Sequence, residues 1–194
     1  PMACGFAVGP SLHDVYRYMK SLKHRGREAA GIVGVGYDSI DVLKWAGPIE
    51  MFDLEDLQKI LSRKGHHTFM GHVRYATRGR KEDILDEAHP HVIGGVVDHR
   101  GDHIIIENCD VAGVHNGQFD GGFFDESIEA KLTTGCDTEA ALHLYQAIGE
   151  RGMIERVPGS YTMAIADRRR KDIIVMRGSA AITPGVLGMK DGSH

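Results

Sequence analysis

The chain has 194 residues, of which 42% are hydrophobic and 26% are charged, and its formal net charge is −4. This composition is ordinary for one soluble globular domain, and the length is too short for two large ones. The weakly acidic balance gives no basic footprint for nucleic acid, and no apolar run approaches the roughly 18 residues that would cross a membrane. The three cysteines form no CxxC pair and no even framework, which favours reduced thiols and a cytoplasmic protein.

The first half of the chain predicts short strands separated by two helices. Apolar residues recur at helical spacing in both helices, and Ser11 and Asp53 are suited to cap them. In chain order the elements are a strand at 4–8, a helix at 11–22, a hairpin of 31–37 and 40–44, a helix at 54–61, and a strand at 68–75.

The second half predicts more strands and one long helix. In chain order these are a loop at 78–91, strands at 92–97, 104–107 and 111–115, a helix at 138–148, and a strand pair of 161–167 and 172–177. Strands that come in runs, with few helices between them, indicate an α+β domain with antiparallel sheets. No linker or internal repeat divides the chain, so a single domain over 1–194 is expected.

Cys4 lies almost at the start of the chain, where a cysteine has a special chemical use. An N-terminal cysteine carries a thiol and a free α-amine, and an amine with a pKa of about 8 can act as the base for the thiol. The residues Pro1-Met2-Ala3 precede Cys4, so this use requires their removal. The alternative is a buried strand cysteine, because free cysteine is among the most buried residue types.

Two arginine-containing segments could serve such a nucleophile. Arg25 follows the first helix in His24-Arg25-Gly26, and an arginine near a thiol favours the thiolate. Arg74 ends a strand in Gly71-His72-Val73-Arg74-Tyr75-Ala76-Thr77, where its guanidinium could hold a carboxylate and Thr77 adds a hydroxyl. The alternatives are a solvated basic turn and a surface loop.

Two further segments allow both a structural and a catalytic interpretation. Asn116-Gly117 matches a hairpin turn, but an amide side chain followed by a glycine N–H also suits an oxyanion hole. Asp137 could cap the long helix, or it could receive a substrate ammonium group beside a cleft. The chain has 12 histidines but no HExxH or Cys/His ligand spacing, so the sequence predicts no metal site.

Taken in order, these segments resemble the glutamine amidotransferase domain of class II, the N-terminal-nucleophile type. The resemblance runs from Cys4 to about Gly188. The matching blocks are Cys4-Gly5-Phe6, residues 24–32, residues 71–77, His115-Asn116-Gly117 and Asp137-Thr138-Glu139. The second and third blocks look most like amidophosphoribosyltransferase, whereas Ala88-His89-Pro90-His91 looks more like glucosamine-6-phosphate synthase.

The resemblance implies a four-layer αββα sandwich of two antiparallel sheets and hydrolysis of the glutamine side-chain amide to glutamate and ammonia, without a cofactor. It also implies a role for each matching residue. Cys4 would be the nucleophile, Asn116 and Gly117 would stabilise the oxyanion, Arg74 and Thr77 would hold the glutamine α-carboxylate, Asp137 would hold the α-ammonium, and Arg25 would support the loop beside the nucleophile.

Several alternatives remain open at this level. Residues 1–3 fit a propeptide or a cloning remnant, and the chain could be a fragment or a subunit that passes ammonia to a separate synthase, alone or as a homo-oligomer. An unprocessed chain would instead be a catalytically silent domain that binds glutamine or regulates a partner. A third interpretation, a hydrolase that uses Cys109 or Cys136, lacks an obvious base beside either thiol.

Overall fold

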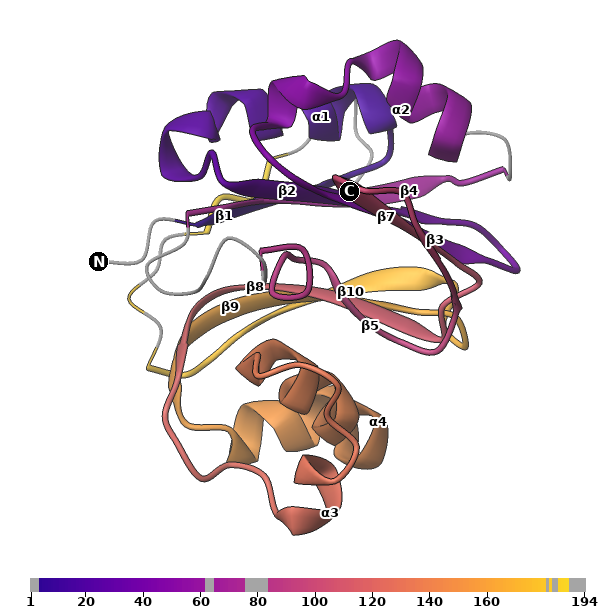
Figure 1. The fold of residues 1–194 in the computed structure, drawn as a ribbon. Coiled ribbons are helices and arrows are strands. Elements are labelled where there is room, and N and C mark those ends of the chain that lie inside the picture. The colour runs from indigo at the N-terminus through magenta and orange to yellow at the C-terminus, as the bar shows by residue number, and fades with distance from the viewer. Residues whose placement is uncertain (1–3, 62–64, 76–83, 181, 183–184, 189–194) are drawn as a thin grey trace.

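The structure is a computed structural model, and it describes residues 4–61, 65–75, 84–180, 182 and 185–188. Two antiparallel sheets lie face to face, with helices on the outer face of each sheet (Figure 1). The layers therefore follow the order helix, sheet, sheet, helix. This confirms the predicted α+β sandwich.

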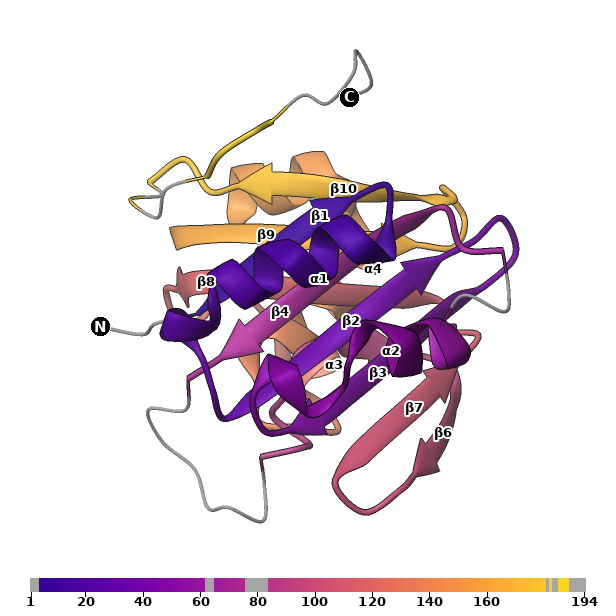
Figure 2. The ribbon, with the colours of Figure 1, turned by 90° about the horizontal axis from the view of Figure 1, so that it is seen from above.

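The first sheet has the strand order β1-β4-β2-β3-β7-β6. Helices α1 (Leu12–Ser21) and α2 (Leu54–Leu61) cover its outer face (Figure 2). Its strands are β1 (Gly5–Gly9), β2 (Ala29–Val35), β3 (Ile40–Ala46), β4 (Thr68–Arg74), β6 (Val96–His99) and β7 (His103–Glu107). The predicted hairpin is confirmed, since β2 and β3 pair antiparallel along their whole length.

Both predicted caps of the first two helices are present. The Ser11 hydroxyl accepts a hydrogen bond from the backbone N–H of Asp14 at 3.1 Å, and the Asp53 carboxylate accepts one from Asp56 at 2.9 Å. Each bond satisfies a backbone donor that has no partner inside its helix, which stabilises a helix by about 1 kcal/mol.

The second sheet has the strand order β10-β9-β8-β5 and carries α3 (Glu126–Glu129) and α4 (Asp137–Arg156) on its outer face (Figure 1). Its strands are β5 (His91–Ile93), β8 (Val111–Phe119), β9 (Gly159–Asp167) and β10 (Asp172–Arg177). The predicted pair of late strands is confirmed, since β9 and β10 pair antiparallel around the basic turn.

Two predictions about this half of the chain were wrong, and one short helix was missed. The single strand expected at 92–97 is two strands in different sheets, because Gly94 and Gly95 take φ values of 71° and 100° and turn the chain between them. Asp137 does not cap α4 but is its first residue, and Cys136 holds the cap position without a side-chain hydrogen bond. The short helix α3 was not predicted.

Buried side chains form a core in each interface between the layers. Trp45 of β3 and Leu57 and Leu61 of α2 belong to the cluster between the first sheet and its helices, and all three are fully buried. Val33 and Ala164 meet between the two sheets. Burying a side chain the size of leucine stabilises the fold by about 1.5–3 kcal/mol, so these interfaces hold the layers together. In the described part of the chain, no helix is both long and apolar enough to cross a membrane.

Candidate functional site

Cys4 lies at one end of the first sheet, directly before β1. The carbonyl oxygen of Cys4 accepts a hydrogen bond from Nε of Arg25 at 2.8 Å. Arg25 belongs to the short 3-10 helix η1 (Lys23–Arg25), and Gly26 follows it. A Cβ atom on Gly26 would lie 2.6 Å from backbone atoms of Arg74, so only glycine lets this turn approach the end of β4. The sequence blocks that contain Cys4, Arg25 and Arg74 therefore meet at one place.

The thiol of Cys4 is half-buried, and its surroundings act on it in opposite directions. Burial is the largest effect and raises the pKa of the Cys4 thiol. A hydrogen bond from the backbone of Tyr75 and the positive charges of Arg74 and Arg25 lower that pKa, but they do not outweigh burial. The thiol is therefore protonated near neutral pH, and a base is needed to make it a nucleophile.

Arg74 is the last residue of β4, next to the start of β1 (Figure 2). Its guanidinium forms an ion pair with the carboxylate of Glu87. The side chain of Arg74 keeps 15% of its surface exposed and that of Glu87 34%, so the pair borders solvent. Glu87 was not among the site residues predicted from the sequence. Thr77, the predicted partner of Arg74, lies outside the described residues.

Asn116 and Gly117 lie inside β8 and face Thr162 and Tyr161 of β9. The hairpin turn considered for this dipeptide is therefore wrong. Gly117 has a φ of 131°, and a Cβ atom there would lie 2.1 Å from the carbonyl oxygen of Ser160. Only glycine fits this conformation and this space.

Two buried histidines connect the arginine end of β4 with Asn116 and Asp137. Nε2 of His72 in β4 lies 3.1 Å from the carbonyl oxygen of His115 in β8, and because a carbonyl only accepts, Nε2 carries the proton. Nδ1 of His115 lies 4.0 Å from a carboxylate oxygen of Asp137. Burial lowers the pKa of His72 to about 3 and that of His115 to about 4, so both rings are neutral at pH 7.

The positive charge of Arg74 acts on two of the three thiols. Burial raises the pKa of the Cys4 thiol and raises that of Cys136 to about 11, and in both cases the charge of Arg74 is a smaller, opposing effect. Cys109 is different, because its side chain is fully buried and burial raises its pKa to about 12. Of the three cysteines, Cys4 and Cys136 lie near this arginine, and Cys4 has the basic neighbours that suit a nucleophile.

Comparisons with known proteins find that the chain is similar to a glutamine amidotransferase domain and to two kinds of named enzyme. A family model described as a glutamine amidotransferase domain matches residues 104–194. Glutamine–fructose-6-phosphate aminotransferase (isomerizing) of Halobacterium salinarum is 30% identical over 190 residues, which cover 91% of this chain and 28% of that protein. Amidophosphoribosyltransferase of Schizosaccharomyces pombe is 27% identical over 200 residues, which cover 92% of this chain and 34% of that protein.

Solved structures agree with the observed fold. A structure described as the allosteric regulatory enzyme of purine biosynthesis matches with a TM-score of 0.62 and 23% identity, over 85% of this chain and 35% of the other. Glutamine phosphoribosylpyrophosphate amidotransferase from B. subtilis matches with a TM-score of 0.57 and 22% identity, again over 85% of this chain and 35% of the other. The chain thus spans about a third or less of the proteins that it matches.

Proposed function

We propose that this chain, which carries a glutamine amidotransferase domain of class II, hydrolyses the side-chain amide of L-glutamine to glutamate and ammonia. The observation that supports this most is the meeting of Arg25, Arg74 and the Cys4 thiol at the end of the first sheet. The groups expected to bind and activate an amide lie in β8 of the second sheet and at the start of α4.

Cys4 is the proposed nucleophile. Its raised pKa calls for a base, and the α-amine of Cys4 supplies one once residues 1–3 are removed. The amine takes the thiol proton, the sulfur attacks the amide carbon, and the C–N bond breaks as the amine returns the proton to the leaving ammonia. A γ-glutamyl thioester remains, and water hydrolyses it to glutamate and the free thiol.

Asn116 and Gly117 are the proposed oxyanion donors. Attack on the amide turns its carbonyl oxygen into an oxyanion, which the side-chain amide of Asn116 and the backbone N–H of Gly117 would bind. Such fixed donors act most strongly in a site with little water, because they need no reorganisation when the charge develops. The φ of 131° at Gly117 gives a backbone direction that other residues rarely adopt.

The charged residues are proposed to hold the two ends of glutamine. Arg74, with Thr77, takes the α-carboxylate, and Asp137 takes the α-ammonium. Arg25 positions the nucleophile through its hydrogen bond to the Cys4 carbonyl. Because Glu87 is paired with Arg74, the substrate carboxylate must share the guanidinium with Glu87 or displace it.

We further propose that a synthase uses the ammonia. The relatives are named glutamine–fructose-6-phosphate aminotransferase and amidophosphoribosyltransferase, and this chain spans only about a third or less of each. A synthase that receives the ammonia is therefore the expected partner. The residues described above do not determine which molecule that synthase aminates.

An ammonia-release assay tests the proposal, on protein whose N-terminus is known from its intact mass. Protein that begins at Cys4 should release ammonia from glutamine, and protein that keeps residues 1–3 should not. A Cys4→Ala variant should be folded and inactive. If mature protein binds glutamine without releasing ammonia, the alternative of a glutamine-binding or regulatory domain is correct. The relatives' names, which are those of enzymes, do not favour that alternative.

A further inference from the structure

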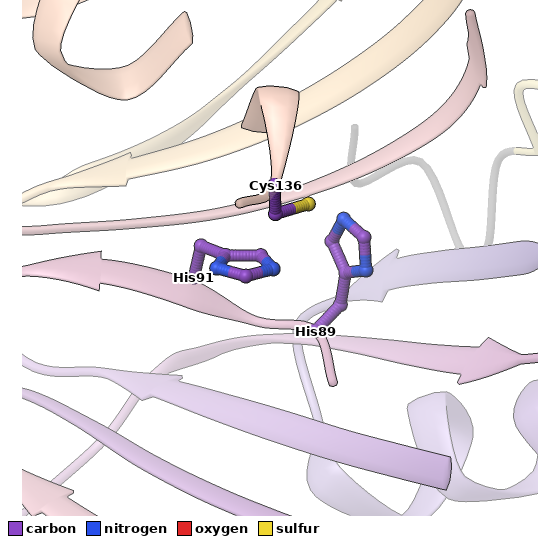
Figure 3. Close-up of side chains that lie close together, drawn as sticks. All are labelled: His89, His91 and Cys136. Atoms are coloured by element: carbon purple, nitrogen blue, oxygen red, sulfur yellow. The ribbon is translucent and has the colours of Figure 1, made fainter. Parts of the chain in front are cut away.

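A cluster of two histidines and one cysteine lies inside the sandwich, and the proposed reaction uses none of the three. His89, His91 and Cys136 each offer one ligand atom, and these atoms all lie within 4.8 Å of one another. Figure 3 shows Cys136 reaching in from the start of α4, while His89 lies just before β5 and His91 is the first residue of β5. His89 keeps 7% of its surface exposed and His91 3%.

His91 is oriented as histidines are in metal sites. The backbone of Glu87 makes a hydrogen bond to the His91 ring, and Nε2 has no hydrogen-bond partner among the described residues, so Nδ1 makes that bond. Metal-binding histidines usually donate one ring N–H to a carbonyl in this way and present the other nitrogen to the metal. In Figure 3 the outer nitrogen of His91 points toward His89 and lies below the Cys136 sulfur.

His89 and Cys136 are held in place by Thr138. The Thr138 hydroxyl lies 2.9 Å from Nε2 of His89 and also interacts with the Cys136 side chain. Within the described residues, Nδ1 of His89 has no partner. The rings of His89 and His91 stand nearly perpendicular, with centroids 4.9 Å apart. In the part of the chain that the structure describes, Nε2 of His91 is the unpartnered nitrogen that faces the cluster, and buried polar atoms are normally hydrogen-bonded. The nitrogen of His89 that lies nearer to the Cys136 sulfur in Figure 3 is Nε2, so a metal there would take the place of the contact with Thr138.

We propose that His89, His91 and Cys136 form a binding site for a divalent transition metal ion of the zinc class. Imidazole and thiolate are the ligands that zinc prefers, and three protein ligands leave a fourth position for water or another donor. With zinc bonds of about 2.0–2.3 Å, tetrahedral ligands stand roughly 3.5 Å apart, so the site has to close by about 1 Å on binding. Cys136 is only half-buried and sits at a helix start, where such a movement is easiest.

The charges around the cluster limit its affinity. The Lys44 ammonium donates a hydrogen bond to the carbonyl oxygen of Ala88 at 3.2 Å, and its positive charge helps to lower the pKa of His91. The positive charge of the Arg74 guanidinium has a lowering effect on the pKa of all three proposed ligands. Both cations oppose a bound dication, whereas the Cys136 thiolate offsets one charge. On binding, Cys136 loses its proton to solvent and the metal–sulfur bond forms, with no change of oxidation state. This metal site goes beyond the proposed glutaminase activity and does not depend on it.

Cobalt binding tests the site, because Co²⁺ bound to a thiolate gives a charge-transfer band that the free ion lacks. The sample is the metal-free full chain without a histidine tag, carrying Cys4→Ala so that this thiol cannot bind the probe. We expect a band that saturates at one Co²⁺ per chain and is displaced by Zn²⁺. Cys136→Ser should abolish the band, and His91→Asn should weaken binding at least tenfold.

The matched control is Cys109→Ser, which removes a buried thiol outside the cluster and should keep the band. Far-ultraviolet circular dichroism checks that each variant is folded. As a second measurement, Zn²⁺ should raise the thermal midpoint of the Cys4→Ala protein and leave that of the Cys4→Ala/Cys136→Ser protein unchanged, since only a state that binds the ion is stabilised by it. The absence of a band in the folded Cys4→Ala protein, or an unchanged band with Cys136→Ser, would overturn the proposal.

Discussion

Replacing Asn116 by alanine removes the side-chain donor proposed to bind the oxyanion and leaves the backbone of β8 in place. Asn116 faces Thr162 across the β8–β9 pair, and its side chain is half-buried. Alanine fits a strand without strain, and no other described side chain depends on Asn116 for a hydrogen bond that the structure records. We therefore expect stability to change by less than about 1 kcal/mol.

The expected loss of activity follows from the chemistry of the oxyanion. Removing one oxyanion donor costs about 2.7–4 kcal/mol in the transition state, which is about 10²–10³-fold in kcat. Because the side chain of Asn116 is not fully buried, water can replace part of the lost interaction, and the expected loss lies near the lower end, about 100-fold. KM for glutamine should change little, since the donor acts on a charge that is absent from the bound substrate.

Steady-state ammonia release over a range of glutamine concentrations measures both constants. Gln118→Ala is the matched control, because Gln118 follows two positions later on the same face of β8 and is exposed. The control should keep kcat within about twofold, as surface substitutions usually do. If Asn116→Ala retains kcat within threefold, or if only KM rises, Asn116 does not bind the oxyanion.

Three further changes have expected outcomes. Glu87→Gln should lower KM for glutamine by up to about fivefold, because it frees Arg74 from its ion pair. A partly exposed ion pair of this kind stabilises by about 0.2–1 kcal/mol. A raised KM would contradict the proposed competition between Glu87 and the substrate carboxylate. Gly117→Ala should lower the free energy of unfolding in urea by about 2–4 kcal/mol, because a Cβ atom 2.1 Å from the Ser160 oxygen adds overpacking to backbone strain; an unchanged denaturation midpoint would refute this. kcat/KM should rise with pH and level off above about pH 8. The raised pKa keeps the Cys4 thiol protonated, so the unprotonated α-amine must remove its proton. A flat profile between pH 6 and 9 would argue against the amine as the base.

Features of the fold that depend on neighbouring residues could be predicted from the sequence. The Ser11 and Asp53 caps and the β9–β10 hairpin were predicted because each rests on contacts within one element or across one turn. The split of 92–97 was missed because its apolar residues fit one strand as well as two. Gly94-Gly95 is a turn signal in the sequence, and the structure shows that the strands on either side of it join different sheets.

The site shows the same division between local and distant contacts. Five short blocks in a fixed order predicted the site residues, although no block is specific alone, and the blocks of Cys4, Arg25 and Arg74 meet in the structure. The ion pair of Arg74 with Glu87 and the contact of His72 with His115 join residues far apart in the sequence, and no spacing rule reports them. The cluster that contains His89 and Cys136 was missed for the same reason, since its ligands come from separate segments without a metal-binding motif.

The central claim is that Cys4 forms a covalent bond with the glutamine carbonyl group, and trapping that bond tests it most directly. Protein verified to begin at Cys4 is incubated with a glutamine-analogue electrophile, digested, and mapped by mass spectrometry. One label per chain is expected, on Cys4, and excess glutamine should slow the labelling. A label on Cys109 or Cys136, or labelling of Cys4 that glutamine does not slow, would contradict the account.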